Sequence, residues 1–238
     1  MNLMLGDCLE RMKEIPDGSV DMILTDPPYG TTSCKWDSII DLPLMWEQLK
    51  RIIKPNGAIV MTASQPFTTT LIGSNMKMFK YCWVWDKKKH ANAMLAKIQP
   101  LKIHEDIVVF SLKKHYYQPI KEQRKPRVDK QSLIKNGDNF GGKSVLRKYE
   151  NSQGLYYPKS ILEVSNANQK GKVHPTQKPV ALMEYLIKTY TNENETVLDF
   201  TMGSGSTGVA AKNLNRNFIG IEMDEGYFNI AQDRIENA

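Results

Sequence analysis

A carboxylate, two prolines and an aromatic ring follow one another in the sequence TDPPYG, as Asp26, Pro27, Pro28 and Tyr29. Each proline fixes its own φ and lacks an N–H donor, so the peptide after Asp26 is stiff and extended. The Asp26 carboxylate and the Pro27 carbonyl are therefore two hydrogen-bond acceptors in fixed positions. Two such acceptors can hold both N–H bonds of an exocyclic amino group on adenine or cytosine and direct its delocalised lone pair at an electrophile. A base buried in a duplex must first flip out, and Tyr29 offers a ring on which it can stack. An ordinary turn after a strand is the alternative.

A glycine-rich loop near the carboxyl end of the chain, in the sequence VLDFTMGSGSTGVAA, is typical of a nucleotide-binding turn. It carries Gly203, Gly205 and Gly208 between an apolar run and a helical pattern. Such glycines let the backbone approach a ligand closely, and the N-terminus of the following helix offers unpaired N–H groups. The next apolar run ends in Glu222, whose carboxylate is placed to accept hydrogen bonds from ribose hydroxyls.

The same glycine spacing also fits the dinucleotide fingerprint of dehydrogenases. Only sixteen residues follow Glu222, too few to complete a dinucleotide-binding sheet, and no hydride-transfer site is evident. A glycine turn that binds no ligand is the other alternative. We therefore expect strands from earlier in the chain to complete the sheet.

Apolar, β-rich runs alternate with amphipathic helical patterns along most of the chain. The predicted strands cover residues 2–5, 21–25, 58–62, 81–86, 106–111, 196–200 and 218–222. One helical stripe runs from Met45 to Ile53 and should end at the Pro55-Asn56-Gly57 turn, and a second, from Leu182 to Tyr190, is entered through Pro179. This alternation predicts an α/β fold with a doubly wound, mostly parallel sheet. Ligands of such sheets bind at the carboxyl ends of the strands, where both the Asp26 turn and the glycine loop fall.

The positive charge of the chain is concentrated in its middle. Residues 113–172 contain fourteen Lys or Arg and five Asp or Glu, an excess of +9, whereas the rest of the chain sums to −3. This segment has little apolar periodicity and several tyrosines. It fits a nucleic-acid-facing insertion in an otherwise neutral enzyme, and a solvated lysine-rich loop is the alternative.

The remaining composition indicates a cytoplasmic protein. The three cysteines, Cys8, Cys34 and Cys82, show neither a CxxC pair nor metal-ligand spacing, so we expect reduced thiols and no metal site. No apolar run approaches the ~18 residues of a membrane helix, and the N-terminus does not resemble a signal peptide.

TDPPYG together with DFTMGSGST closely resembles the amino-methyltransferases that form N6-methyladenine or N4-methylcytosine in DNA. The order, with DPPY first and the glycine loop last, resembles the β class of that family. The resemblance implies a circularly permuted Rossmann-like methyltransferase fold with a seven-stranded sheet and helices on both faces. It divides the chain into a catalytic half (1–112), a target-recognition insertion (113–172) and a cofactor-binding half (173–238).

Carried over residue by residue, the resemblance implies a site for S-adenosylmethionine. Asp7 matches the acid at the adenine end of the cofactor, and Glu222 matches the acid that binds its ribose. The sequence HPTQKPVALMEYL, from His174 to Leu186, resembles the segment over the methionine end, with Lys178 at its motif position. The cofactor loop is matched by Phe200, Gly203, Ser204 and Gly205, and the catalytic motif, which also contacts the cofactor through Asp26, is matched by Asp26, Pro27, Pro28 and Tyr29.

Within the family, aspartate at the first position of DPPY favours adenine N6 as the target, with cytosine N4 as the rival. Cytosine C5 methylation needs a cysteine nucleophile in a Pro-Cys setting, which this chain lacks. Methylation of a protein glutamine uses asparagine in place of Asp26 and a glycine loop that comes first. An inactive subunit that binds DNA or cofactor is the alternative from another class. The resemblance further implies double-stranded DNA as substrate, a homodimer, a separate restriction endonuclease and a bacterial or phage source.

Overall fold

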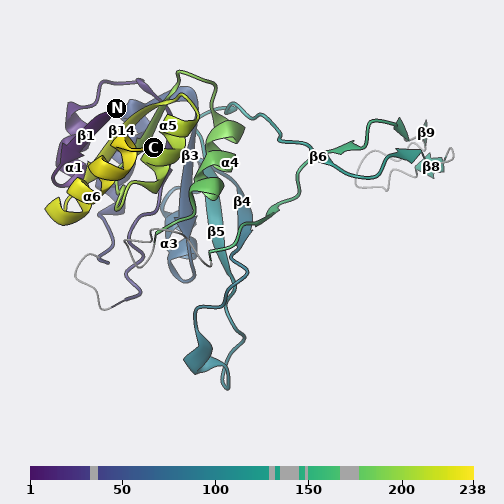
Figure 1. Ribbon diagram of the computed structural model, residues 1–238, viewed down its shortest axis with the longest axis horizontal. Coiled ribbons are helices and arrows are strands. Elements are labelled where there is room, and N and C mark those ends of the chain that lie inside the picture. Colours follow the sequence, from purple (N-terminus) through teal and green to yellow (C-terminus); the bar gives the residue numbers. More distant parts are fainter. Residues whose placement is uncertain (33–36, 129–131, 135–144, 148–149, 167–176) are drawn as a thin grey trace. The chain divides into compact units, whose positions relative to one another are not determined.

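The computed structural model describes residues 1–32, 37–128, 132–134, 145–147, 150–166 and 177–238. The chain forms two units, one of Met1–Gln118 with Ser160–Ala238 and one of Pro119–Lys159. The second unit lies within the segment expected as an insertion at 113–172. The first unit therefore contains both ends of the chain, and Figure 1 shows the two termini on the same part of it.

An eight-stranded sheet forms the centre of the first unit (Figure 1). Its order is β1 (Asn2–Leu5), β14 (Asn217–Glu222), β13 (Thr196–Asp199), β2 (Val20–Thr25), β3 (Ile53–Ala63), β5 (His104–Phe110), β4 (Phe79–Asp86) and β12 (Ile161–Glu163). Neighbouring strands are parallel except where β5 pairs antiparallel with β3 and with β4. The prediction of a mostly parallel sheet and of all seven strands is confirmed.

The predicted number of strands was wrong, because the sheet has an eighth strand, β12. It pairs in parallel with β4, Leu162 lying opposite Trp85. β12 has three residues, of which only Leu162 is buried, so its sequence is too short to show a strand pattern. It comes from the segment expected to be an insertion, and it belongs to the first unit.

The centre of the sheet joins the two ends of the chain. Val197 and Leu198 of β13 pair in parallel with Met22 and Ile23 of β2. Two strands separated by about 170 residues therefore end at the same edge of the sheet. The Asp26 turn follows one of them, and the glycine loop follows the other.

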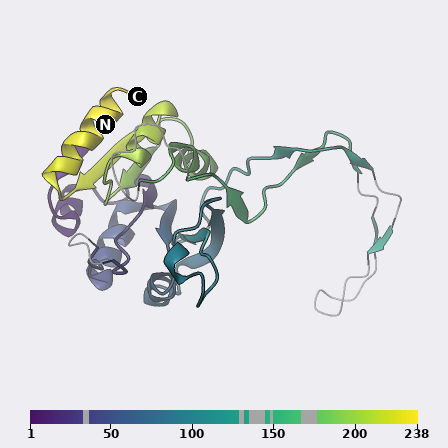
Figure 2. The same ribbon diagram turned by 60° about the horizontal axis from the view of Figure 1, so that its bottom comes forward.

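Helices cover both faces of the sheet, as predicted. One apolar cluster joins β2 to α4 (Val180–Tyr190), α5 (Ser206–Asn213) and α6 (Glu225–Glu236), and its members include Met22, Leu24, Leu186 and Ile235. The other joins the opposite face to α2 (Leu42–Ile52) and α3 (Phe67–Ser74), with Ile23 on the sheet. Figure 2 shows α4–α6 on one side of the sheet and the helices of the N-terminal half on the other.

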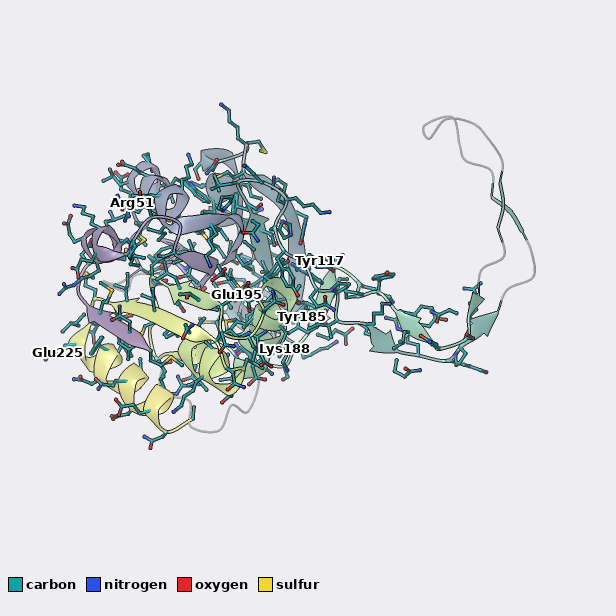
Figure 3. All side chains as sticks on the ribbon, turned by 90° about the horizontal axis from the view of Figure 1, so that it is seen from above. Arg51, Tyr117, Tyr185, Lys188, Glu195 and Glu225 are labelled. Carbon is teal, nitrogen blue, oxygen red and sulfur yellow. The ribbon has the colours of Figure 1, made fainter. Side chains whose placement is uncertain are left out.

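Both predicted helical stripes are buried, but one predicted boundary was wrong. α4 begins directly after Pro179 and carries Tyr185, which Figure 3 labels. The Tyr185 ring packs edge-on against Trp83, with ring centroids 6.1 Å apart. α2 ends at Ile52, and β3 begins at the next residue and runs through Pro55-Asn56-Gly57. The turn residues thus lie inside the strand, and Pro55 and Asn56 are exposed there, so the missing N–H of proline is tolerated.

The second unit contains short antiparallel strand pairs, although its sequence shows little apolar periodicity. They are β6 (Glu122–Gln123) with β11 (Leu155–Tyr156), β7 (Arg127–Val128) with β10 (Glu150–Asn151), and β8 (Ser132–Ile134) with β9 (Val145–Arg147). Cation–π contacts support it, from Lys121 to Tyr157 and from Arg124 to Tyr156. Each strand has only two or three residues, so no alternating pattern was visible in the sequence.

In the part of the chain that the structure describes, no helix is both long enough and apolar enough to cross a membrane.

Gly208 is required for helix packing, and we expect Gly208→Ala to destabilise the protein by about 1–2 kcal/mol. A Cβ there would lie 2.3 Å from Ile235 Cδ1 and 2.8 Å from Phe218 Cε1, and overpacking of ~1–3 kcal/mol exceeds the ~1 kcal/mol gained in helix propensity. Urea unfolding measures the effect. The matched control is Gly73→Ala in α3, where a Cβ meets nothing within 4 Å and stability should rise. Equal effects of the two substitutions would contradict this account of Gly208.

Candidate active site

A cavity of about 640 Å³ opens at the carboxyl edge of the sheet, beside the ends of β2, β13 and β14. Both halves of the chain contribute to its lining. Of the predicted site residues it contains Asp7, Asp26, Pro28, Lys178, Phe200, Gly203, Ser204 and Glu222. The structure thus brings the Asp26 turn and the glycine loop into one cavity, although their order in the chain separates them widely.

The Asp26 carboxylate is held by three side chains from three parts of the chain. Its Oδ1 accepts hydrogen bonds from the Tyr29 hydroxyl at 2.6 Å and from the Thr62 hydroxyl. Its Oδ2 accepts a hydrogen bond from Lys178 Nζ at 2.7 Å. An ionised carboxylate offers about four acceptor sites. Because both sites of Oδ1 are used, the remaining site on Oδ2 is the one left for a ligand in the cavity.

Lys178 belongs to a buried chain of alternating charges. It lies 2.7 Å from Asp26 and 3.3 Å from Glu105 Oε2, and Glu105 Oε1 pairs with Lys87 at 2.9 Å. Burial lowers the pKa of Lys178, but Asp26 and Glu105 outweigh burial and leave that pKa above its ordinary value. Burial likewise raises the pKa of Glu105, and Lys178 and Lys87 bring it below its ordinary value. Lys178 and Glu105 are therefore both charged near neutral pH.

Tyr29 holds Asp26 as well as offering a ring. Burial and the nearby charge of Asp26 raise the pKa of Tyr29 well above its usual value, so its hydroxyl stays a donor. One face of the ring stacks on Phe67, with centroids 5.4 Å apart. Lys178 Nζ lies 5.8 Å from the ring centroid. Pro27 is buried, and neither Pro27 nor Tyr29 is among the described residues that line the cavity.

Asp37 fixes the backbone that follows the Asp26 turn. Its Oδ1 accepts hydrogen bonds from the backbone N–H groups of Tyr29 and Gly30, and its Oδ2 from those of Thr31 and Thr32. Burial raises the pKa of Asp37, but hydrogen bonds from the Thr32 side chain and from the backbone N–H groups of Gly30, Thr32 and Thr31 outweigh burial and lower the pKa below its ordinary value. The turn is thus tied at both ends, by Asp37 through its backbone and by Asp26 through Tyr29.

The glycine loop meets Glu222 directly. Gly203 and Gly205 have φ values of +51° and +80°, in the left-handed region that favours glycine. The Gly203 N–H donates to Glu222 Oε2 at 2.9 Å, and the Asp224 N–H donates to Oε1 at 2.9 Å. A Cβ on Gly203 would meet nothing within 4 Å, whereas one on Gly205 would lie 2.9 Å from Ala231 Cβ. Gly203 therefore faces open space, and Gly205 serves close helix packing.

The other residues predicted for cofactor binding have structural contacts of their own. Asp7 caps α1 (Cys8–Arg11), its Oδ1 accepting from the N–H groups of Leu9 and Glu10. Phe200 is buried in the core, with 1% of its surface exposed. Ser204 donates to Gln177 Oε1 at 3.3 Å and accepts from Arg234 Nη1 at 3.0 Å. In HPTQKPVALMEYL, His174 to Thr176 lie outside the described residues.

Asp199 links the two strand ends below the cavity. Its Oδ1 accepts from the Thr25 hydroxyl at 2.8 Å and from the Thr201 N–H at 3.1 Å. The Thr201 hydroxyl lies 2.6 Å from that of Thr25 and donates to the Asp26 carbonyl at 3.2 Å. Burial raises the pKa of Asp199 to about 6. This network fixes the end of β2, which Asp26 follows directly, relative to the end of β13.

Sequence reasoning missed Thr62, Glu105, Lys87 and Asp37. Thr62 is in β3 and Glu105 in β5, and nothing in a single sequence shows which strands neighbour β2. Asp37 follows the DPPY turn closely enough to have been considered as a partner for it. Cys8 and Cys82 are free thiols, and Cys34 lies outside the described residues. Among the residues that the structure describes, no His, Cys, Asp and Glu side chains form a metal-binding group.

Comparisons with known proteins identify relatives of the chain. A family model described as DNA methylase (N6_N4_Mtase) matches residues 20–233. The chain is 27% identical over 247 residues to the type II methyltransferase M.HpaI of Haemophilus parainfluenzae, covering 99% of this chain and 74% of that protein. It is 29% identical over 245 residues to the type II methyltransferase M1.MboII of Moraxella bovis, covering 94% and 92%.

Two solved structures share the fold. The M1.HpyAVI–SAM complex matches with a TM-score of 0.67 and 28% identity, covering 98% of each chain. The cytosine-N4-specific PvuII DNA methyltransferase matches with a TM-score of 0.69, covering 98% of this chain and 85% of that one. At 17% identity, the second likeness concerns the fold alone.

We expect Asp199→Asn to change how stability depends on pH. The pKa of Asp199 is about 6 in the folded protein and 3.8 for the unperturbed group. The folded state therefore binds the proton more tightly, and the wild type loses stability as pH rises through 6. Between pH 5 and pH 7.5 the loss amounts to about 1.4 kcal/mol, since one pKa unit corresponds to about 1.36 kcal/mol.

The asparagine side chain cannot titrate, so the variant should not show this loss of stability. Urea unfolding of both proteins at pH 5 and pH 7.5 measures the loss. A constant difference in unfolding free energy between wild type and Asp199→Asn would contradict the raised pKa.

Proposed function

The chain belongs to the N6/N4 DNA methylase family, and we propose that it transfers a methyl group from S-adenosylmethionine to the N6 amino group of adenine in double-stranded DNA. The observation that carries the proposal is that Asp26, the glycine loop and Glu222 line one cavity. The chain is a type II DNA methyltransferase of this family. By the resemblance to type II relatives we also propose a separate restriction endonuclease as its companion, and a homodimer.

The described residues fit S-adenosylmethionine. A cavity of about 640 Å³ is of the size that binds a small molecule. Each Glu222 oxygen accepts one backbone N–H, which leaves acceptor sites for two ribose hydroxyls. Among the described residues, Ser206 Oγ is buried without a hydrogen-bond partner, and Ser206 lines the same cavity. A polar ligand group there would satisfy it.

When bound, the cofactor supplies an electrophilic methyl group on a sulfonium centre. The work of the protein is to present the amino group to it. Asp26 Oδ2 is the acceptor for one N–H of the amino group, and the Pro27 carbonyl is the proposed acceptor for the other. Both atoms are fixed beforehand, Asp26 by Tyr29, Thr62 and Lys178, so little reorganisation is needed at the moment of reaction.

Tyr29 has two proposed roles in this reaction. Its hydroxyl orients Asp26, as the hydrogen bond at 2.6 Å requires. Its ring, which stacks on Phe67, is the proposed stacking partner for a flipped base. The basic second unit and its flanks, within residues 113–172, are proposed to bind DNA phosphates and to read bases, since their charge suits a polyanion.

Asp26→Ala should abolish methyl transfer and leave cofactor binding largely intact, because Asp26 holds the amino group rather than the cofactor's adenosine. Transfer of tritiated methyl from S-adenosylmethionine to unmodified DNA measures the first quantity, and calorimetric titration measures the second. We expect a loss of at least a thousandfold in rate with a Kd within about fivefold of wild type. Near-normal turnover of Asp26→Ala would sink the proposed mechanism.

Glu222→Ala should show the opposite pattern. Loss of a partly buried, hydrogen-bonded carboxylate costs ~1–3 kcal/mol, so the Kd for S-adenosylmethionine should rise by about 5- to 150-fold. At saturating cofactor the transfer rate should recover most of its wild-type value. Asp224→Asn at the next turn, which keeps an N-cap acceptor for α6, is the matched control. An unchanged Kd for Glu222→Ala would contradict the assignment.

A further inference from the structure

The segment between β4 and β5, residues 87–103, forms a hairpin at the catalytic edge of the sheet. Because β4 and β3 are both antiparallel to β5, the carboxyl end of β4 lies at the same edge as Asp26. Lys87 at the base of the hairpin pairs with Glu105, and Lys178 lies between Glu105 and Asp26. Figure 1 shows this hairpin, with its helical turn, extending beyond the sheet. We call it the β4–β5 hairpin.

The hairpin has a defined neck and tip. The N–H of Lys87 donates to the Ile103 carbonyl at 2.9 Å, and that of Ala91 donates to the Lys102 carbonyl at 3.2 Å. The Asn92 side chain closes the neck, donating to the Pro100 carbonyl at 3.1 Å and accepting from the Lys102 N–H at 2.6 Å. The tip begins with a 3₁₀ turn, Ala93–Leu95.

The tip exposes apolar side chains that contribute nothing to the core. Met94 is 98% exposed and Ile98 is 79% exposed. Leu95 in the same turn is also exposed, at 41%, and on the returning side of the hairpin Leu101 and Ile103 are exposed, at 43% and 44%. Grouped exposed side chains of this size mark an interaction surface rather than a packing role.

The hairpin is positively charged, which favours a negatively charged partner. Residues 87–103 contain five lysines and no Asp or Glu. Lys87 and Lys88 are paired with carboxylates at the base. For Lys89, Lys97 and Lys102, no ion pair with a described residue is formed. Cations around an apolar tip suit a polyanion with an apolar interior, which is a nucleic-acid duplex.

We propose that the β4–β5 hairpin enters the DNA duplex beside the target base, with Met94 and Ile98 as an apolar wedge and Lys89, Lys97 and Lys102 on the phosphates. The inference rests on the proposed function, because that function requires a flipped base. Six residues from the base to Asn92 span at most about 20 Å, more than the ~8 Å depth of a DNA groove. A side chain wedged between base steps offsets the lost stacking and keeps the flipped base out.

Sequencing of DNA that the wild type has modified first locates the methylated site. The wedge is then tested by assaying Met94→Ser/Ile98→Ser on two duplexes that contain this site. In one duplex the target base is paired, and in the other it faces a mismatch that lowers the cost of flipping. We expect single-turnover transfer to fall at least tenfold on the paired duplex and to stay within threefold of wild type on the mismatched one. Met94→Leu/Ile98→Leu should retain the wild-type rate on both.

The controls separate the wedge from other roles. Met76→Ser, at a methionine 61% exposed on the same unit, should leave both rates unchanged. Fluorescence of 2-aminopurine at the target position should rise on binding of the wild type and much less with the serine variant. Lys97→Gln/Lys102→Gln should reduce the slope of log K against log salt by about 2, at ~0.9 per phosphate contact.

Three results would overturn the inference. They are an unchanged rate on the paired duplex, equal slowing on both duplexes, and slowing that accompanies loss of an oligomer in sedimentation velocity, which would assign the tip to a second copy of the chain. A wild type that methylates neither duplex would instead overturn the proposed function, and the wedge with it.

Discussion

The site depends on one buried ion pair, between Lys178 and Asp26. It joins residues 152 positions apart in the chain, across the two halves of the sheet. Burying an ammonium group costs several kcal/mol unless carboxylates surround it, and Lys178 has two, Asp26 and Glu105. Lys87 then balances the second carboxylate. The position of the Asp26 carboxylate is therefore set by charges from β5, from the residue after β4 and from the segment before α4, as well as by the two prolines that follow Asp26. Removal of any one member leaves at least one neighbouring charge with one ion-pair partner fewer.

The parallel pairing of β2 with β13 places this ion pair beside the glycine loop. Because the two strands end together, the Asp26 turn and the glycine loop share a cavity, and Asp199, Thr25 and Thr201 connect them below it. Glu222 is fixed in the same way, by backbone N–H groups of Gly203 and Asp224. In the proposed reaction, the amino group of the base and the methyl donor therefore meet at protein atoms that are already in position. Such preorganisation is what transfer to a weakly nucleophilic amine requires.

The sequence predicted seven of the eight strands of the sheet, the two faces of helices and several of the residues that line the cavity, because most of these have a local signal. Buried strands show as apolar runs, and DPPY and the glycine loop are rare combinations. It did not predict β12, whose three residues carry one buried side chain, nor the strand pairs of Pro119–Lys159. It also missed the residues that support Asp26. Thr62, Glu105 and Lys87 are ordinary residues in or beside ordinary strands, and only the order of strands in the sheet makes them neighbours of the site. The interpretation of Gly205 and Gly208 changed as well, since both serve helix packing.

We propose that this chain methylates an exocyclic amino group in DNA, and that this group is the N6 amino group of adenine. Expression in a bacterial host without DNA methyltransferases, followed by digestion of its DNA to nucleosides and mass spectrometry, tests it. The account predicts N6-methyladenine in cells that express the wild type and none in cells that express Asp26→Ala. Detection of N4-methylcytosine would be consistent with the proposed site and chemistry but would contradict adenine as the target base. The absence of any modified nucleoside, from a folded protein that binds S-adenosylmethionine, would contradict the account itself.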